Sequence, residues 1–141
     1  MEALDFASGK VRLLVVEDDP IQRALMREDL TSLGQVDAMG DSESAIARLV
    51  PGGASYAAVV VDLGLPAGPG QAAEQEQGLR VVTAVRHGQT TTPVVVVCSG
   101  NMTDALRAKL RTVGVGSVLM KPFSTRDLVG AVTRLLQPDH S

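Results

Sequence analysis

The chain has 141 residues, of which 45% are apolar and 2% aromatic, and a formal net charge of −3. This length suffices for one hydrophobic core but is short for two, because a domain typically has about 100–150 residues. The acidic balance and the lack of a dense Lys/Arg run exclude a nucleic-acid surface or an anionic membrane surface, which would need clustered cations. The first ten residues lack a long apolar stretch, so they form neither a signal peptide nor a membrane span. The single Cys98 cannot form an internal disulfide, which is typical of a reducing cytoplasm.

Short apolar runs predict the strands. Residues 11–16, 57–61 and 94–98 are rich in Val and apolar at nearly every position, as strands covered on both faces must be. Residues 35–39 and 117–120 predict two weaker strands. Helical stretches separate these runs, so the sequence predicts five βα units with helices on both faces of one parallel sheet.

The first and last predicted helices have the clearest apolar faces. In the first, Met26, Leu30 and Leu33 follow an i, i+4, i+7 spacing, and Ile21 and Leu25 are expected to widen the buried stripe. The last helix is expected to begin with a capping box between Ser124 and Asp127. Its predicted buried residues are Leu128, Val132 and Leu135. We expect one domain over residues 11–137, with tails at residues 1–10 and 138–141.

Polar residues follow the central strands at their carboxyl ends. Glu17 and Asp18 follow the first strand, Asp62 the third, Ser99 the fourth and Lys121 the fifth. The carboxyl ends of parallel strands meet at one edge of a sheet, so these side chains are expected to lie together. Three clustered carboxylates repel one another unless a cation neutralises them, and oxygen-only ligands favour Mg²⁺. A carboxylate nucleophile, a metal ion, an ammonium group and a hydroxyl group suffice for phosphoryl transfer, with Asp62 as the nucleophile.

Two neighbours of these residues have simpler interpretations. Asp19 precedes Pro20, and we expect it to cap the following helix rather than to bind metal. Cys98 is expected to be a small buried core residue. A redox-sensing role for it would require an exposed thiolate of low pKa.

The four strand-end segments together resemble a bacterial response-regulator receiver domain over nearly the whole chain. The matching residues are 14–20, 59–66, 97–100 and 119–123, which read LVVEDDP, VVVDLGLP, VCSG and LMKPF. The resemblance implies a flavodoxin-like, doubly wound α/β fold with five parallel strands in the order 2-1-3-4-5. It also implies a cis peptide bond between Lys121 and Pro122, which is less costly before proline than before other residues.

The resemblance further implies that a histidine kinase or a histidine phosphotransfer protein phosphorylates Asp62. Ser99 and Lys121 would then sense the phosphoryl group. The residues implied to hold Mg²⁺ are Asp18, Asp62, Gly64 through its backbone carbonyl, and Glu17 through water. The expected module catalyses only its own phosphorylation and dephosphorylation, stands alone, and signals by binding an unknown downstream protein.

Two other functions are open on the sequence. A hydrolase of the aspartyl-phosphate type would need a second acid where Gly64 stands, which argues against turnover of an external substrate. A degenerate binding module that is never phosphorylated would not need the complete set of acids, hydroxyl and lysine. The kinase, the downstream target, the signal and the oligomeric state are not specified by the sequence.

Three features depart from the receiver pattern. Eleven residues, 67–77, fill a gap that usually holds three, either as a surface insertion, as two additional helical turns, or as a loop that changes access to the phosphoryl site. Val118 replaces an aromatic residue whose ring turns inward on phosphorylation in many receivers. Gly64 has no side chain to shield an aspartyl phosphate from water, so we expect a short-lived phosphate.

Overall fold

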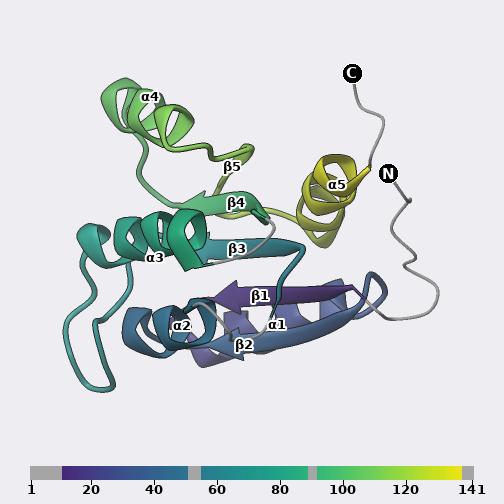
Figure 1. Cartoon of the computed structure of the whole chain (residues 1–141), viewed down its shortest axis with the longest axis horizontal. Coiled ribbons are helices and arrows are strands. Elements are labelled where there is room, and N and C mark those ends of the chain that lie inside the picture. The colour runs from purple at the N-terminus through teal and green to yellow at the C-terminus, as the bar shows by residue number, and fades with distance from the viewer. Residues whose placement is uncertain (1–10, 51–54, 89–91, 138–141) are drawn as a thin grey trace.

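The computed structural model describes residues 11–50, 55–88 and 92–137; both predicted tails lie outside the described residues. Strands and helices alternate along the chain (Figure 1). The strands are β1 Arg12–Val16, β2 Gln35–Met39, β3 Ala58–Asp62, β4 Val94–Ser99 and β5 Ser117–Met120. The helices are α1 Pro20–Leu30, α2 Ser42–Leu49, α3 Gln75–Gly88, α4 Asp104–Thr112 and α5 Thr125–Leu136.

The strands form one parallel sheet in the order β2-β1-β3-β4-β5, which confirms the expected topology. The register places Val16 beside Val61, Asp62 beside Cys98, and Ser99 beside Met120. The residues that end these strands, or directly follow them, therefore lie along one edge of the sheet, as the sequence predicted.

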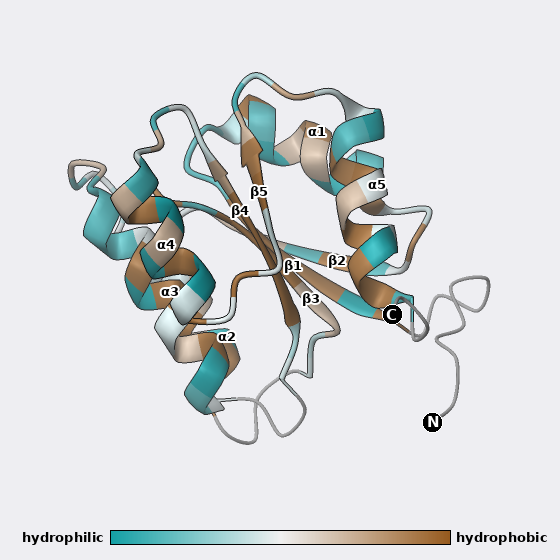
Figure 2. Cartoon of the chain, turned by 90° about the horizontal axis from the view of Figure 1, so that it is seen from above, coloured by the Kyte–Doolittle hydropathy of each residue, from teal (hydrophilic) through white to brown (hydrophobic). Residues whose placement is uncertain are grey.

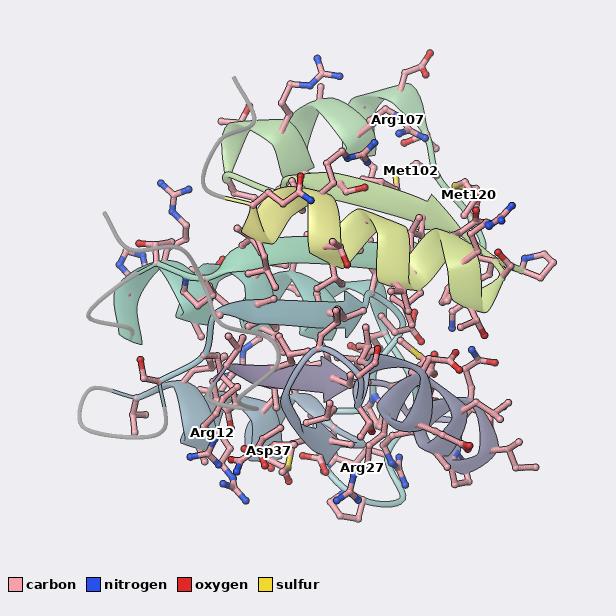
Figure 3. All side chains as sticks on the ribbon, turned by 90° about the vertical axis from the view of Figure 1, so that its right-hand side faces the viewer. Arg12, Arg27, Asp37, Met102, Arg107 and Met120 are labelled. Atoms are coloured by element: carbon pink, nitrogen blue, oxygen red, sulfur yellow. The ribbon has the colours of Figure 1, made fainter. Side chains whose placement is uncertain are left out.

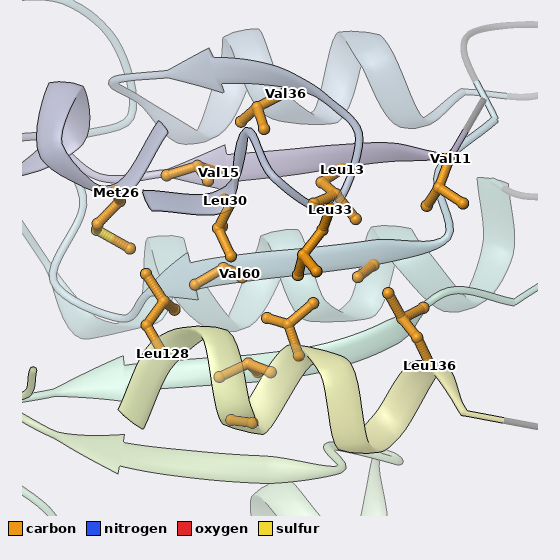
Figure 4. Packing of buried hydrophobic residues seen from close by; sticks show 14 of the residues in the cluster. Val11, Leu13, Val15, Met26, Leu30, Leu33, Val36, Val60, Leu128 and Leu136 are labelled. Atoms are coloured by element: carbon orange, nitrogen blue, oxygen red, sulfur yellow. The ribbon is translucent and has the colours of Figure 1, made fainter. Parts of the chain in front are cut away.

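Helices cover both faces of the sheet, and Figure 2 shows α1 and α5 on one side and α2, α3 and α4 on the other. Successive residues of the central strands point to opposite faces, so each strand contributes to two cores. The core under α1 and α5 includes Leu13, Val15 and Val60, packed against Met26 and Leu128 (Figure 4). The opposite core is formed by the alternate strand residues with α2, α3 and α4. Every residue of β3 is buried, as its apolar sequence predicted.

Helix α1 begins as predicted but buries a narrower face. The Asp19 carboxylate accepts hydrogen bonds from the backbone N–H groups of Ile21 and Gln22, so this residue caps the helix as expected. Ile21 is 73% exposed and Leu25 is 50% exposed, so the prediction that they widen the buried stripe is wrong. Only the Met26 side of α1 faces the sheet, and these two residues lie outside that stripe.

Helix α5 has the predicted capping box, but one buried residue differs. Ser124 and Asp127 satisfy each other's backbone N–H groups. Leu136 is buried, whereas Leu135 is only half-buried and lies over Gly116. The buried row therefore continues from Leu128 at intervals of four residues, and Leu135 lies at its margin.

Helix α3 begins too late to include the two additional helical turns that residues 67–77 could have formed. Backbone hydrogen bonds in both directions join Glu74 to Leu65, with N–O distances of 2.9 and 3.3 Å, and hold this part of the chain extended. The helix therefore begins at Gln75, and residues 67–73 form a loop. Gly78 then packs directly on Leu63, where a Cβ atom would overlap the Leu63 backbone. This close approach ties α3 to the segment that follows Asp62.

Within the ranges described above, no helix combines the length and apolar character needed to span a bilayer.

Candidate functional site

The loop after β1 places two acidic side chains differently. Glu17 is 1% exposed, and its backbone N–H donates to the carbonyl of Met39 at 3.0 Å, which continues the pairing of β1 with β2. Its carboxylate accepts a hydrogen bond from the N–H of Asp19 at 3.2 Å. Asp18 is an exposed residue. One carboxylate is thus fixed inside the protein, and its neighbour lies at the surface.

Asp62 ends β3 and is 7% exposed. Its Oδ1 accepts a hydrogen bond from the backbone N–H of Gly64 at 3.3 Å. A Cβ atom added at Gly64 would meet no heavy atom within 4 Å. The space where a side chain of Gly64 would begin is therefore open, next to the backbone N–H that contacts Asp62.

Lys121 joins the two buried acids. Its Nζ donates to Glu17 Oε1 at 2.8 Å and to Asp62 Oδ2 at 3.1 Å. Burial alone would lower the pKa of Lys121, but the two carboxylates outweigh it and raise the pKa above 10.5, so the side chain stays charged. The peptide bond between Lys121 and Pro122 is cis, as the resemblance implied.

The acids together form an oxygen-rich cluster. One carboxylate oxygen from each of Glu17, Asp18 and Asp62 lies within 4.8 Å of the others. Partial burial of its carboxyl group and the neighbouring Glu17 carboxylate raise the pKa of Asp18 above 3.8. One ammonium group does not balance three carboxylates, so the cluster has the charge and the ligand type of a site for a hard cation.

Ser99 reaches the predicted edge but is engaged locally. It is 7% exposed, and its backbone carbonyl accepts a hydrogen bond from the N–H of Lys121 at 2.9 Å. Its Oγ donates to the carbonyl of Asn101 at 2.8 Å and accepts from the N–H of the same residue at 3.1 Å. In this structure the hydroxyl closes a turn after β4.

Cys98 is fully buried beside this edge. The pKa of its thiol is raised to about 12, mainly by burial. The positive charge of Lys121 lowers this pKa, and the carboxylates of Asp62 and Glu17 raise it further. A thiol held neutral inside the core has neither the exposure nor the thiolate that redox sensing needs.

The inserted loop contacts α2. The carbonyls of Pro66 and Ala67 accept hydrogen bonds from the N–H groups of Ser42 and Glu43, both at 3.0 Å. Ser42 Oγ also donates to Gln77 at 2.6 Å. In Figure 1 the loop is the teal segment that descends past the end of α2. Within the part of the chain that the structure describes, no hydrogen bond joins residues 67–74 to the acidic cluster or to Lys121.

Sequence reasoning missed Arg23. Its Nη1 donates to the backbone carbonyl of Glu17 at 2.9 Å and to that of Asp18 at 3.4 Å. The available signal was a cation one turn into the helix that follows an acidic loop, but the pattern alone does not say where a long side chain points. A surface groove of about 650 Å³ is lined by residues of α2, α3 and α4 and by none of these site residues.

Comparisons with known proteins agree with this geometry. The sequence pattern of the response regulator receiver domain matches residues 13–133. The transcriptional regulatory protein TcrA of Mycobacterium tuberculosis is 33% identical over 127 residues, which are 89% of this chain and 46% of TcrA. The chain thus spans about half the length of this curated relative.

Solved structures share the fold. The non-phosphorylated HemR receiver domain from Leptospira biflexa superposes with a TM-score of 0.75 at 20% identity, covering 94% of this chain and 98% of that one. The receiver domain of sensor histidine kinase PA1611 from Pseudomonas aeruginosa, solved with a magnesium ion in its active-site cleft, gives a TM-score of 0.69 at 22% identity, covering 89% and 97%. With its matched family pattern, sheet order and acidic pocket, the chain belongs to the response regulator receiver domains, the phosphoacceptor signalling modules of two-component phosphorelays.

Proposed function

We propose that Asp62 accepts a phosphoryl group from a histidine kinase or a histidine phosphotransfer protein in a Mg²⁺-dependent reaction. The observation that carries the proposal is the contact of Lys121 with both Glu17 and Asp62 inside a cluster of three carboxylates. An ion pair that only stabilises the surface would need one acid and one base, not a lysine that contacts two buried acids beside a third carboxylate. A site that must hold a phosphoryl group and its counter-ion needs both the surplus of acids and a cation beside the nucleophile.

The donor set of the cluster fits Mg²⁺. Glu17, Asp18 and Asp62 offer only oxygen, and within the described residues neither a His nor a Cys joins this cluster. We assign Asp18, Asp62 and the Gly64 carbonyl as ligands, with Glu17 acting through water. When bound, Mg²⁺ would supply positive charge that offsets the charge of the phosphoryl oxygens. The magnesium ion of the Pseudomonas receiver domain supports this assignment by analogy.

The chain's own residues would perform the remaining steps. An Asp62 carboxylate oxygen attacks phosphorus, a P–O bond forms, and the P–N bond to the donor histidine breaks, with the imidazole taking a proton. Lys121 contacts Asp62 Oδ2 at 3.1 Å and would follow the negative charge onto a phosphoryl oxygen. Ser99 would donate to another phosphoryl oxygen, for which its hydroxyl must leave the carbonyl of Asn101.

The output would pass through contacts with another protein. Val118 lies half-buried on β5 against the core beneath α3 and α4. A branched aliphatic side chain cannot move a large ring between exposed and buried positions, so the signal would depend on repacking of loops or helices. The loop at residues 67–73 is held to α2, so shortening it tests whether it affects access of the phosphodonor.

Labelling with a small acyl phosphate in the presence of Mg²⁺ tests the proposal. We expect about one acid-labile phosphate per chain, no label without Mg²⁺, and no label in Asp62→Asn. Asp104→Asn serves as the matched control, since Asp104 is an exposed acid in the first turn of α4. Multiple turnover of an external phosphomonoester would instead indicate a hydrolase, and an unlabelled wild-type chain would indicate a binding module.

A further inference from the structure

Arg23 reaches back from α1 to the acidic loop. Among the described residues, this half-buried side chain forms no ion pair with a carboxylate of the loop; it donates from Nη1 to the main-chain carbonyls of Glu17 and Asp18. The first hydrogen bond, at 2.9 Å, has good length, and the second, at 3.4 Å, is weak. The guanidinium group therefore holds the backbone that presents the two acids, while Lys121 and the N–H of Asp19 contact the Glu17 carboxylate.

Gly40 makes room for this guanidinium group. A Cβ atom at Gly40 would lie 2.5 Å from Arg23 Nη1, and its three nearest heavy atoms all belong to that guanidinium group. Gly40 directly follows β2, whose Met39 carbonyl pairs with the N–H of Glu17. The Arg23 side chain thus lies where the ends of β1 and β2 meet, and the missing side chain at Gly40 permits it.

We propose that Arg23 is a positioning residue, which fixes the backbone of Glu17 and Asp18 so that their carboxylates stay in a geometry that binds Mg²⁺. The inference rests on the proposed function of the site. Without a bound cation the carboxylates repel one another, so a loop held only by its chain neighbours would relax outward. A planar guanidinium group is suited to hold carbonyl oxygens, because its donors are rigid and always charged.

The sign of the effect separates positioning from simple electrostatics. Arg23 carries a positive charge near a site for a cation, so by charge alone its removal would tighten the binding of Mg²⁺. Loss of positioning has the opposite effect, because the ligands would have to be reordered when the metal binds. Gly40→Ala separates the two contributions further, since it displaces the guanidinium group from the carbonyls but keeps its charge in the protein.

Three variants test the proposal: Arg23→Gln, Gly40→Ala and, as the matched control, Arg27→Gln. Arg27 is an exposed residue one turn further along α1, and it lines a shallow surface groove together with Arg23 and Thr31. Its side chain makes no hydrogen bond within the described residues, in contrast to that of Arg23. The dissociation constant for Mg²⁺ is measured by titrating the isotope-labelled, unphosphorylated protein with MgCl₂ and following its NMR spectrum. Thermal unfolding checks that each variant is folded.

We expect Arg23→Gln and Gly40→Ala each to weaken Mg²⁺ binding by about tenfold, the lower end of the cost of removing an outer partner of a metal ligand. The double variant should bind no more weakly than the weaker single variant, since both changes remove the same contact. Arg27→Gln should bind as the wild type does. Should Arg23→Gln fail to fold, Gly40→Ala carries the test, because its Cβ meets only the flexible end of Arg23.

Unchanged or tighter binding in Gly40→Ala and Arg23→Gln, with a wild type that binds Mg²⁺, would overturn the inference and leave the proposed function intact. A wild-type protein that binds no Mg²⁺ would overturn both.

Discussion

Two charged clusters lie at the two ends of β1, and they differ in how their charges are matched. At the start of the strand, Asp37 on β2 accepts from Arg12 at 2.9 Å and from the Tyr56 hydroxyl at 2.6 Å, and Arg48 lies 3.8 Å away. Arg12 and Asp37 are labelled side by side in Figure 3. At the end of the strand, three carboxylates lie together, and Lys121 forms ion pairs with two of them, Glu17 and Asp62.

The contrast shows which cluster is structural. The single negative charge of Asp37 faces two positive charges, those of Arg12 and Arg48. Its Oδ2 accepts hydrogen bonds from Arg12 and from the Tyr56 hydroxyl, both of which belong to the protein. Burial and the hydrogen bond to Asp37 raise the pKa of Tyr56 to about 12, so its hydroxyl keeps the proton that it donates. The acidic cluster has the opposite imbalance, and partial burial together with the neighbouring Glu17 carboxylate raises the pKa of Asp18. The surplus of acids at this sheet edge is typical of a cation site, whereas the cluster around Asp37, whose carboxylate is paired within the protein, joins β1 and β2.

The largest expected effect is on Mg²⁺ affinity in Asp18→Asn. This change removes an assigned ligand and should weaken binding by roughly 100-fold, or about 2.7 kcal/mol. It also relieves repulsion, so the melting temperature without metal should rise slightly, on the order of 1–2 °C after screening by solvent. Titration with MgCl₂ and thermal unfolding measure the two changes. A variant that loses both stability and affinity would contradict the contrast between the clusters.

Asp37→Asn should show the reverse pattern. Two arginines would lose their carboxylate, and with partial exposure of the cluster we expect a loss of about 2 kcal/mol in the free energy of unfolding. Mg²⁺ affinity should not change. Urea unfolding gives the loss, and a large fall in Mg²⁺ affinity of the folded variant would show that the two clusters are not independent.

Gly64→Met should lengthen the lifetime of the aspartyl phosphate. A Cβ atom added at Gly64 would meet no heavy atom within 4 Å, so a side chain can start there without a clash, and we expect it to shield the phosphoryl group from water. We expect a few-fold slower loss of label, which corresponds to about 1 kcal/mol or less. Gly100→Ala is a suitable control, because it also adds atoms to open space near the site. Equal lifetimes in wild type and Gly64→Met would exclude shielding at this position.

The smallest effect concerns pH. Since the pKa of Asp18 is raised in the folded state, the fold binds this proton more tightly than the unfolded chain does. Its charge therefore destabilises the metal-free fold above the raised pKa, and this penalty disappears as the pH falls toward 3.8. The stability advantage of Asp18→Asn over wild type should be present at pH 7 and shrink as the pH falls toward 3.8. An advantage that grows on acidification would contradict this sign.

Much of the fold followed from the sequence, because strands buried on both faces must be apolar throughout. The strand order came from the resemblance and is confirmed. The predicted edge brings Glu17, Asp18, Asp62 and Lys121 together, since parallel strands end at one edge. The roles assigned to these residues in phosphorylation stay predictions.

Other features depended on contacts that spacing does not encode. The exposure of Ile21 and Leu25 followed from how α1 lies on the sheet, which apolar character alone does not specify. The later start of α3 followed from the pairing of Glu74 with Leu65, a contact that overrides helix propensity. Arg23 was missed because its partners are backbone carbonyls, which any sequence has.

Identification of the phosphorylated residue tests the central claim most directly. The wild-type protein is incubated with Mg²⁺ and an acyl phosphate, the acyl phosphate formed on the protein is reduced with borohydride, and the reduced residue is located by mass spectrometry of peptides. We predict that Asp62 alone is modified. Modification of Glu17, Asp18 or any acid outside the cluster, or of no residue, would contradict the account.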